Sequence, residues 1–104
     1  MADKTGISRG TAASENTALQ KEQEAIREAI SEVDAELLPL LNRRAALSLQ
    51  IGSLKRQAGL PVHQPERELR KLAELGAANS GPLDAGQIAT IYERIFEVSR
   101  ALQK

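Results

Sequence analysis

The chain has 104 residues, the usual size of one domain, and its 14 basic and 14 acidic side chains cancel. This balance excludes a global attraction to nucleic acid or to an anionic membrane, so any anionic ligand must be held by local charges. There is no cysteine, which excludes disulfides, thiolate metal sites and a cysteine nucleophile. The only aromatic residues are Tyr92 and Phe96, and no stretch alternates with the period of a strand, so an all-helical fold is expected.

Residues 1–16 are rich in Ala, Ser, Thr and Gly and show no helical periodicity. We expect them to form a disordered tail, followed by one domain over residues 17–104. The tail lacks the continuous apolar segment of a signal peptide, and no later segment reaches transmembrane length. A soluble cytoplasmic protein is therefore expected.

A long helix is predicted to begin between Asn16 and Gln23 and to end near Gln57, just before Gly59. Pro39 lies inside it, and a proline there is compatible with one kinked helix or with two shorter helices. One kinked helix is favoured because the apolar positions keep their register through Pro39. These positions alternate steps of four and three along one face: Ile26, Ile30, Val33, Leu37, Leu40, Leu47, Ile51 and Leu54.

Two shorter helices are predicted in the rest of the chain. Pro65 suits the first position of a short helix that ends between Gly76 and Asn79. Asp84, with Gln87 three residues later, predicts the capping box of a medium helix that runs on to the last residues. The expected order is therefore a long, a short and a medium helix.

The length of the first helix also predicts an assembly. A helix of about 30 residues spans about 50 Å, whereas a compact domain of about 100 residues has a radius of gyration of about 13 Å. The apolar face would be exposed over part of that length unless a second copy covered it. An intertwined homodimer that shares this helix is the simplest solution.

One position on the apolar face carries a charge. The step after Leu40 is Arg44, and a buried guanidinium is costly unless a partner offsets it. Arg44 is therefore either a side chain that reaches water at the dimer edge or the ligand of an anion. Lys55 lies about 16 Å further along by helical rise, which leaves room for one small molecule. Arg27 lies about 42 Å from Lys55, so it could reach that molecule only from an antiparallel partner copy.

Other polar residues lie on the predicted helix faces, and each also has an ordinary explanation. Lys55 and Glu68 lie near helix ends, where charges of their signs commonly stabilise the helix. Ser99 and Gln103 continue the apolar face of the last helix, where polar residues of a fraying end are common. His63 has no companion at metal-ligand or triad spacing, so no metal or cofactor is predicted.

Several short motifs follow one another along the chain, and their joint order and spacing are specific. They are Ile26-Arg27-Glu28-Ala29-Ile30, Leu40-Leu41-Asn42-Arg43-Arg44, Ile51-Gly52 with Lys55, Gly59-Leu60-Pro61-Val62, Pro65-Glu66-Arg67-Glu68, and Ser99-Arg100-Ala101-Leu102-Gln103. Together they resemble the all-helical, type II chorismate mutases. The resemblance covers the chain from about Leu19 onward.

The resemblance implies an intertwined helical homodimer that converts chorismate to prephenate, on the route to Phe and Tyr, without cofactor or metal. It implies that Lys55 and Gln103 hydrogen-bond the ether oxygen, that Arg44 pairs with a carboxylate, and that Glu68 meets the ring hydroxyl. Arg27 would come from the partner subunit, and Arg67 is a weaker candidate for a supporting charge. The implied substrate-binding residues are Arg27, Arg44, Lys55, Gln64, Glu68, Ser99 and Gln103.

This chemistry suits a chain that offers no activated nucleophile. A concerted rearrangement of a dianion needs cations that fold the flexible arm over the ring, and donors at the oxygen of the breaking bond. Two alternatives stay open, namely an isochorismate-pyruvate lyase on the same scaffold and a non-catalytic regulatory or docking dimer. Only the lyase would yield salicylate. Association with another enzyme of the shikimate pathway also stays open.

Overall fold

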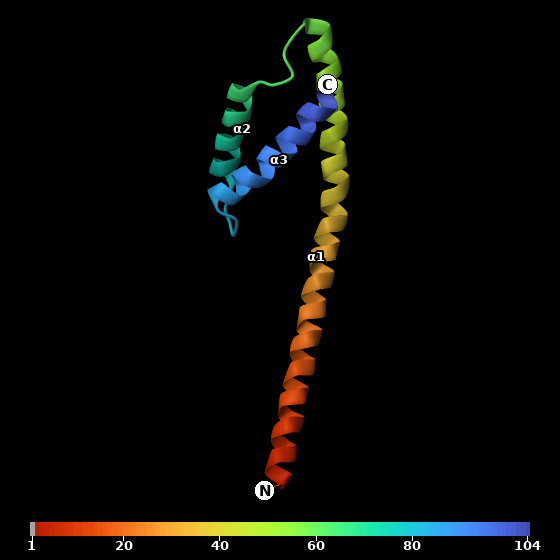
Figure 1. The fold of residues 1–104 in the computed structure, drawn as a ribbon, viewed down its shortest axis with the longest axis vertical. Coiled ribbons are helices and arrows are strands. Elements are labelled where there is room, and N and C mark those ends of the chain that lie inside the picture. The colour runs from red at the N-terminus through yellow and green to blue at the C-terminus, as the bar shows by residue number, and fades with distance from the viewer. Residues whose placement is uncertain (1) are drawn as a thin grey trace. The chain divides into compact units, whose positions relative to one another are not determined.

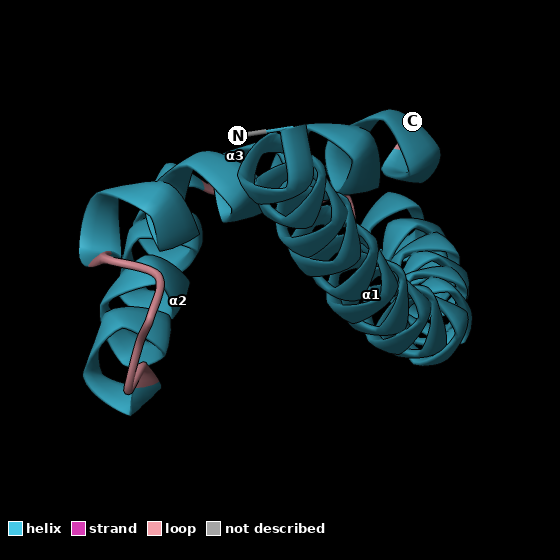
Figure 2. Ribbon diagram, turned by 90° about the horizontal axis from the view of Figure 1, so that it is seen from below, coloured by secondary structure: helices cyan, strands magenta, loops and turns pink. Residues whose placement is uncertain are grey.

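The computed structural model describes the backbone of residues 2–104 and the side chains of residues 14–104. Three helices follow one another: α1 spans Ala2–Ala58, α2 spans Pro65–Ala78 and α3 spans Ala85–Gln103. The described residues contain no strand (Figure 1, Figure 2). The prediction of an all-helical fold with one long, one short and one medium helix is confirmed.

The long helix begins earlier than predicted. α1 starts at Ala2, so the expected start between Asn16 and Gln23 is wrong. No proline precedes Pro39, and the two early glycines cost a helix only about 1 kcal/mol each, so no residue forces a break.

Pro39 lies inside α1, which confirms one helix rather than two. The side chains of residues 1–13 lie outside the described residues, and a disordered tail over residues 1–16 with a domain over residues 17–104 stays a prediction.

Local signals end α1 and begin the two shorter helices at the predicted places. Gly59 follows α1 with a φ of +70°, the left-handed conformation that closes helix ends. Pro65 is the first residue of α2. Asp84 accepts from the Gln87 amide at 2.8 Å, while the Gln87 side chain accepts from the Asp84 amide at 3.0 Å. This capping box fixes the start of α3.

The chain divides into two compact units, residues 1–40 and residues 41–104. The first unit is the first part of α1, and all of its described side chains are exposed. The predicted apolar face is therefore uncovered within this unit. Its large apolar side chains are Leu19, Ile26, Ile30, Val33, Leu37, Leu38 and Leu40.

The second unit holds the end of α1 together with α2 and α3. From the end of α2, α3 runs back toward the last turns of α1 (Figure 1). The two helices meet closely at Gly52, where an added Cβ would lie 2.8 Å from the Cα of Gln103. Phe96 is buried beside them, with its ring centroid 6.0 Å from that of Tyr92. A small residue at position 52 thus allows α3 to bring its last turn against α1.

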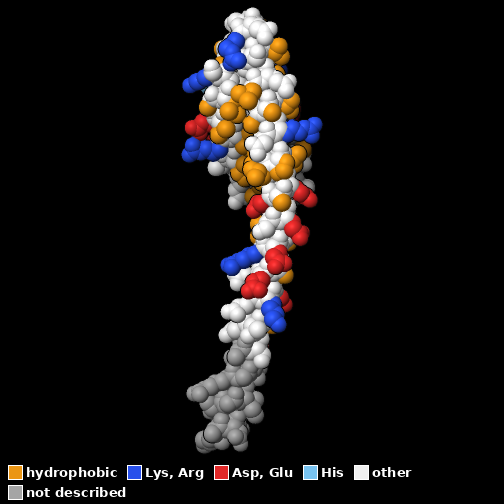
Figure 3. Space-filling view, turned by 90° about the vertical axis from the view of Figure 1, so that its right-hand side faces the viewer, with side chains coloured by type: hydrophobic (Ala, Val, Ile, Leu, Met, Phe, Trp, Pro, Cys, Tyr) orange, Lys and Arg blue, Asp and Glu red, His pale blue; other side chains and the backbone are white. Residues whose placement is uncertain are grey.

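Apolar side chains also gather on the surface of the second unit (Figure 3). On α1 the exposed ones are Leu41, Leu47, Leu49, Ile51 and Leu54. Among the described residues, Phe96 is the one apolar side chain counted as buried. No helix in the described part of the chain has both the length and the hydropathy needed to cross a membrane. Apolar side chains that gather on a surface in this way suit contact with another chain.

Candidate functional site

A cavity of about 250 Å³ lies within the second unit, among α1, α2 and α3. It brings together six of the seven predicted binding residues, and Arg67 with them. The seventh, Arg27, lies on α1 in the unit of residues 1–40. The cavity is lined by Arg44, Leu47, Ser48, Ile51, Lys55, Val62, Gln64, Arg67, Glu68, Lys71, Phe96, Ser99, Arg100 and Gln103.

Helix α1 supplies Arg44, Ser48 and Lys55, whose spacings of four and seven residues place them on one face. The half-buried Arg44 donates a hydrogen bond from NH1 to the Ser99 hydroxyl. Its guanidinium carbon lies 5.7 Å from the centroid of the Phe96 ring, within reach of a cation–π contact. Ser48 also donates to the Ser99 hydroxyl, at 3.2 Å. Arg44, the charged residue on the apolar face of α1, therefore has partners at the cavity wall.

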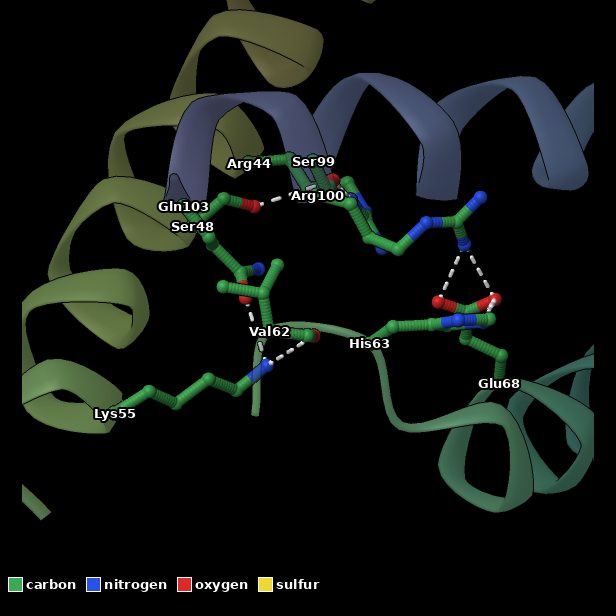
Figure 4. Close-up of polar contacts among 9 residues, drawn as sticks. All are labelled: Arg44, Ser48, Lys55, Val62, His63, Glu68, Ser99, Arg100 and Gln103. Carbon is green, nitrogen blue, oxygen red and sulfur yellow. Dashed lines mark hydrogen bonds and ion pairs between the residues drawn. The ribbon is translucent and has the colours of Figure 1, made fainter. Parts of the chain in front are cut away.

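Lys55 and Gln103 meet at another part of the wall (Figure 4). The Lys55 ammonium donates to Oε1 of Gln103 at 2.7 Å and to the carbonyl of Val62 at 3.1 Å. Burial lowers the pKa of Lys55 from 10.5, the positive charge of Arg67 lowers it further, and the negative charge of Glu68 opposes them. Arg56 donates to the Gln103 carbonyl at 2.8 Å, which holds the last turn of α3 in place.

The first turn of α2 places two charges and an amide at the cavity. The Gln64 carbonyl accepts from the amides of Arg67 and Glu68 at 3.1 and 3.2 Å. The Gln64 side chain makes no capping hydrogen bond and lines the cavity instead. The Glu68 carboxylate accepts from NH1 of Arg100 through both oxygens, each at 2.6 Å (Figure 4). His63 lies beside the same carboxylate, with Nε2 3.8 Å from Oε1.

The charge of the lining favours an anionic ligand. Five cationic side chains face one carboxylate, that of Glu68, so the wall is strongly positive. The cations are Arg44, Lys55, Arg67, Lys71 and Arg100. Among the described residues there is no cluster of His, Asp or Glu that could hold a metal ion. The arrangement can bind a small polyanion and donate hydrogen bonds to it.

Some lining residues were not predicted as site residues. Ser48 carries a usable signal, because it lies four residues after Arg44 on the same helix face. Lys71 likewise lies one turn after Arg67 on α2. Arg100 carries no such signal, since its partner Glu68 is 32 residues away on another helix.

Comparison with known proteins agrees with the motifs. A family model described as chorismate mutase type II matches residues 26–104. The chain belongs to this family. The resemblance inferred from the motifs is therefore confirmed.

Relatives and solved structures of the family include chains of similar length. The chorismate mutase of Methanocaldococcus jannaschii is 32% identical over 85 residues, which cover 76% of this chain and 81% of that protein. The structure of chorismate mutase (form II) from Thermus thermophilus has a TM-score of 0.75 and 38% identity, covering 77% of this chain and 91% of that one.

Other relatives are longer. The bifunctional chorismate mutase/prephenate dehydratase of Aquifex aeolicus is 34% identical over 88 residues, or 81% of this chain. The chain spans only 24% of the length of that relative.

Substitution of Gly52 tests the close approach of α1 and α3. Gly52→Ala should lower the free energy of unfolding by about 1–3 kcal/mol, because the new Cβ overlaps the backbone of Gln103. Gly76→Ala is the matched control, since it lies inside α2 with nothing within 4 Å of an added Cβ. It should stabilise the protein by about 0.5–1 kcal/mol.

Urea unfolding of both variants at equal protein concentration measures the difference. Equal stabilisation by the two substitutions would contradict the close contact at Gly52.

Proposed function

We propose that this chain rearranges chorismate to prephenate. In this reaction the C–O bond of the enolpyruvyl ether breaks while a C–C bond forms, and the electrons move within one cyclic transition state. No proton, metal or external electron is exchanged. The observation that carries the proposal is the meeting of Lys55 and Gln103 in a strongly cationic cavity of small-molecule size.

Lys55 and Gln103 suit the developing charge on the ether oxygen. Because Oε1 of Gln103 accepts from Lys55, the amide group that remains to face a ligand is the NH2 donor. The ammonium of Lys55 has three protons, and two are used by Gln103 and Val62. One ammonium proton of Lys55 and the amide protons of Gln103 therefore stay available for hydrogen bonds to the ether oxygen. Donors fixed in this way stabilise charge that grows in the transition state.

The other groups suit the carboxylates and the hydroxyl of the substrate. Arg44, held by Ser99 and Phe96, presents a guanidinium to one carboxylate. Arg27 of a partner copy would bind the second carboxylate in a homodimer. With both ends held, the flexible arm lies over the ring and the reacting carbons meet. Glu68 would accept a hydrogen bond from the ring hydroxyl, and the Gln64 amide would accept from that hydroxyl or donate to it.

The setting of the reaction is part of the same proposal. We place it in the cytoplasm, with a second copy of the chain covering the exposed apolar face of α1. A prephenate-consuming enzyme is a candidate partner, because one relative carries both activities in its name. The family comparison favours neither the lyase nor the non-catalytic dimer that the sequence left open.

The first test mixes the purified chain with chorismate, follows the loss of its absorbance and identifies the product. Prephenate is expected. Lys55→Ala should reduce kcat by about 100- to 1,000-fold, the usual cost of one donor at a developing oxyanion. Arg44→Ala should also abolish most of the turnover.

Arg94→Ala provides the control, because Arg94 is 80% exposed and, among the side chains that the structure describes, its ion pair is with Glu97 on the same helix. It should leave turnover unchanged. Formation of salicylate from isochorismate would contradict the proposed reaction. Near-normal turnover by Lys55→Ala would contradict the proposed site.

The pH profile follows from the lowered pKa of Lys55. The ammonium must be protonated to donate, so the alkaline fall of kcat/KM should occur below pH 10.5. A bound dianion favours the protonated form, so the alkaline fall of kcat should lie at higher pH than that of kcat/KM. In an active Lys55→Arg variant, whose guanidinium stays charged, this fall should disappear. A fall that Lys55→Arg leaves in place would assign it to another group.

The assembly is tested by light scattering at micromolar concentration, which should give twice the mass of one chain. Val33→Glu places a charge on the apolar face and should shift the protein toward monomer, with loss of turnover. Ala35→Glu adds the same charge on the opposite side of α1 and should leave the dimer intact. A wild-type monomer with full turnover would exclude a site that needs Arg27 of a second copy.

A further inference from the structure

Arg100 and Glu68 form the sheltered ion pair of the second unit. The pair joins α3 to α2, and the exposed fractions of the two side chains are 29% and 24%. NH1 of Arg100 lies 2.6 Å from both carboxylate oxygens, and both residues line the cavity. The contact therefore belongs to the cavity wall.

The other Lys/Arg ion pairs among the described residues differ from this one. Lys71–Glu74 and Arg94–Glu97 each lie within one helix, three residues apart, and all four side chains are more than half exposed. Exposed pairs of this kind contribute little to stability. A partly buried pair between two helices instead fixes the position of its side chains, since turning away leaves a charge without its partner.

Glu68 needs such a restraint because other basic side chains surround it. It lies close enough to Lys55 to raise the pKa of that ammonium, and Arg67 acts on the same ammonium from α2. Nε2 of His63 lies 3.8 Å from Oε1 of Glu68. A carboxylate free to turn would approach Lys55, and would then compete with Gln103 for the ammonium protons.

The geometry of the pair also leaves Glu68 able to accept further hydrogen bonds. A carboxylate offers about four acceptor positions, and Arg100 occupies only the side that faces α3 (Figure 4). His63 lies beside Oε1, so an acceptor position on Oε2 stays available to a hydroxyl of a ligand in the cavity.

We propose that Arg100 is a positioning residue, which holds the Glu68 carboxylate toward α3 so that it accepts from the substrate hydroxyl and leaves Lys55 to Gln103. This inference rests on the proposed mutase function. Arg100 acts through Glu68 and makes no contact with the substrate.

A double-mutant cycle on kcat/KM for chorismate tests the inference. Arg100→Gln should lower kcat/KM by about tenfold, a usual size for the coupling of two residues in contact. In the Glu68→Gln background the same change should cost less than about twofold, because the group that Arg100 positions is gone. Arg100→Lys should recover part of the loss, and Arg94→Gln on the same helix should match the wild type.

Two outcomes of this cycle would overturn the inference. An equal loss from Arg100→Gln in both backgrounds would show that Arg100 contacts the substrate itself. No loss in the wild-type background would show that Glu68 holds its place without Arg100.

A second readout does not depend on turnover. NMR titration of the Lys55 ammonium follows its pKa, which should rise in Arg100→Gln because the released Glu68 approaches Lys55. The direct loss of the Arg100 charge contributes to this rise in both backgrounds, so the rise should be larger with Glu68 present than in Glu68→Gln.

Equal rises in the two backgrounds would overturn the positioning role. If the wild-type chain leaves chorismate unchanged, the proposed function fails, and this titration still decides whether Arg100 controls the position of Glu68.

Discussion

Five cationic side chains line one small cavity of the second unit, and the structure around them must offset their mutual repulsion. Each of the three best-held cations meets an acceptor: Arg44 a hydroxyl, Lys55 an amide oxygen and a carbonyl, and Arg100 a carboxylate. One carboxylate cannot balance the remaining charge, so the wall stays positive. The neutral acceptors hold Arg44 and Lys55 in place without cancelling their charge, and a bound dianion would offset part of the excess positive charge.

The acceptors reach the cations because local signals set the course of each helix. Gly59 ends α1 in the left-handed conformation, and Pro65 begins α2 after a short loop that carries the Val62 carbonyl. Gly52 lets the last turn of α3 approach α1, where Arg56 holds the Gln103 carbonyl. Single residues of small size or fixed φ therefore decide whether Lys55 and Gln103 meet.

The sequence predicts this fold well where the signals are local, and less well where they are not. Periodicity, the glycine and proline at the helix ends and the capping box at Asp84 predicted three helices and most of their bounds. The start of α1 was missed, because weak helix formers without a proline neither require nor prevent a helix. Arg44 stood out because it breaks an apolar pattern. Arg100 did not, since its importance comes from a contact with α2 that only the tertiary structure defines.

The apolar face of α1 bears on stability and, through the proposed dimer, on the proposed function. A single chain buries little apolar surface, and hydrophobic burial is the main favourable term in folding, so the exposed face over residues 26–40 represents stabilisation that a single chain does not obtain. Arg27 lies within the same stretch of helix as these uncovered side chains. A second copy that covered the face would therefore also immobilise Arg27, and the entropy of fixing that long side chain would be offset by apolar burial before any substrate bound. If Arg27 of a second copy binds the substrate as proposed, assembly of the dimer would also preorganise the second carboxylate site.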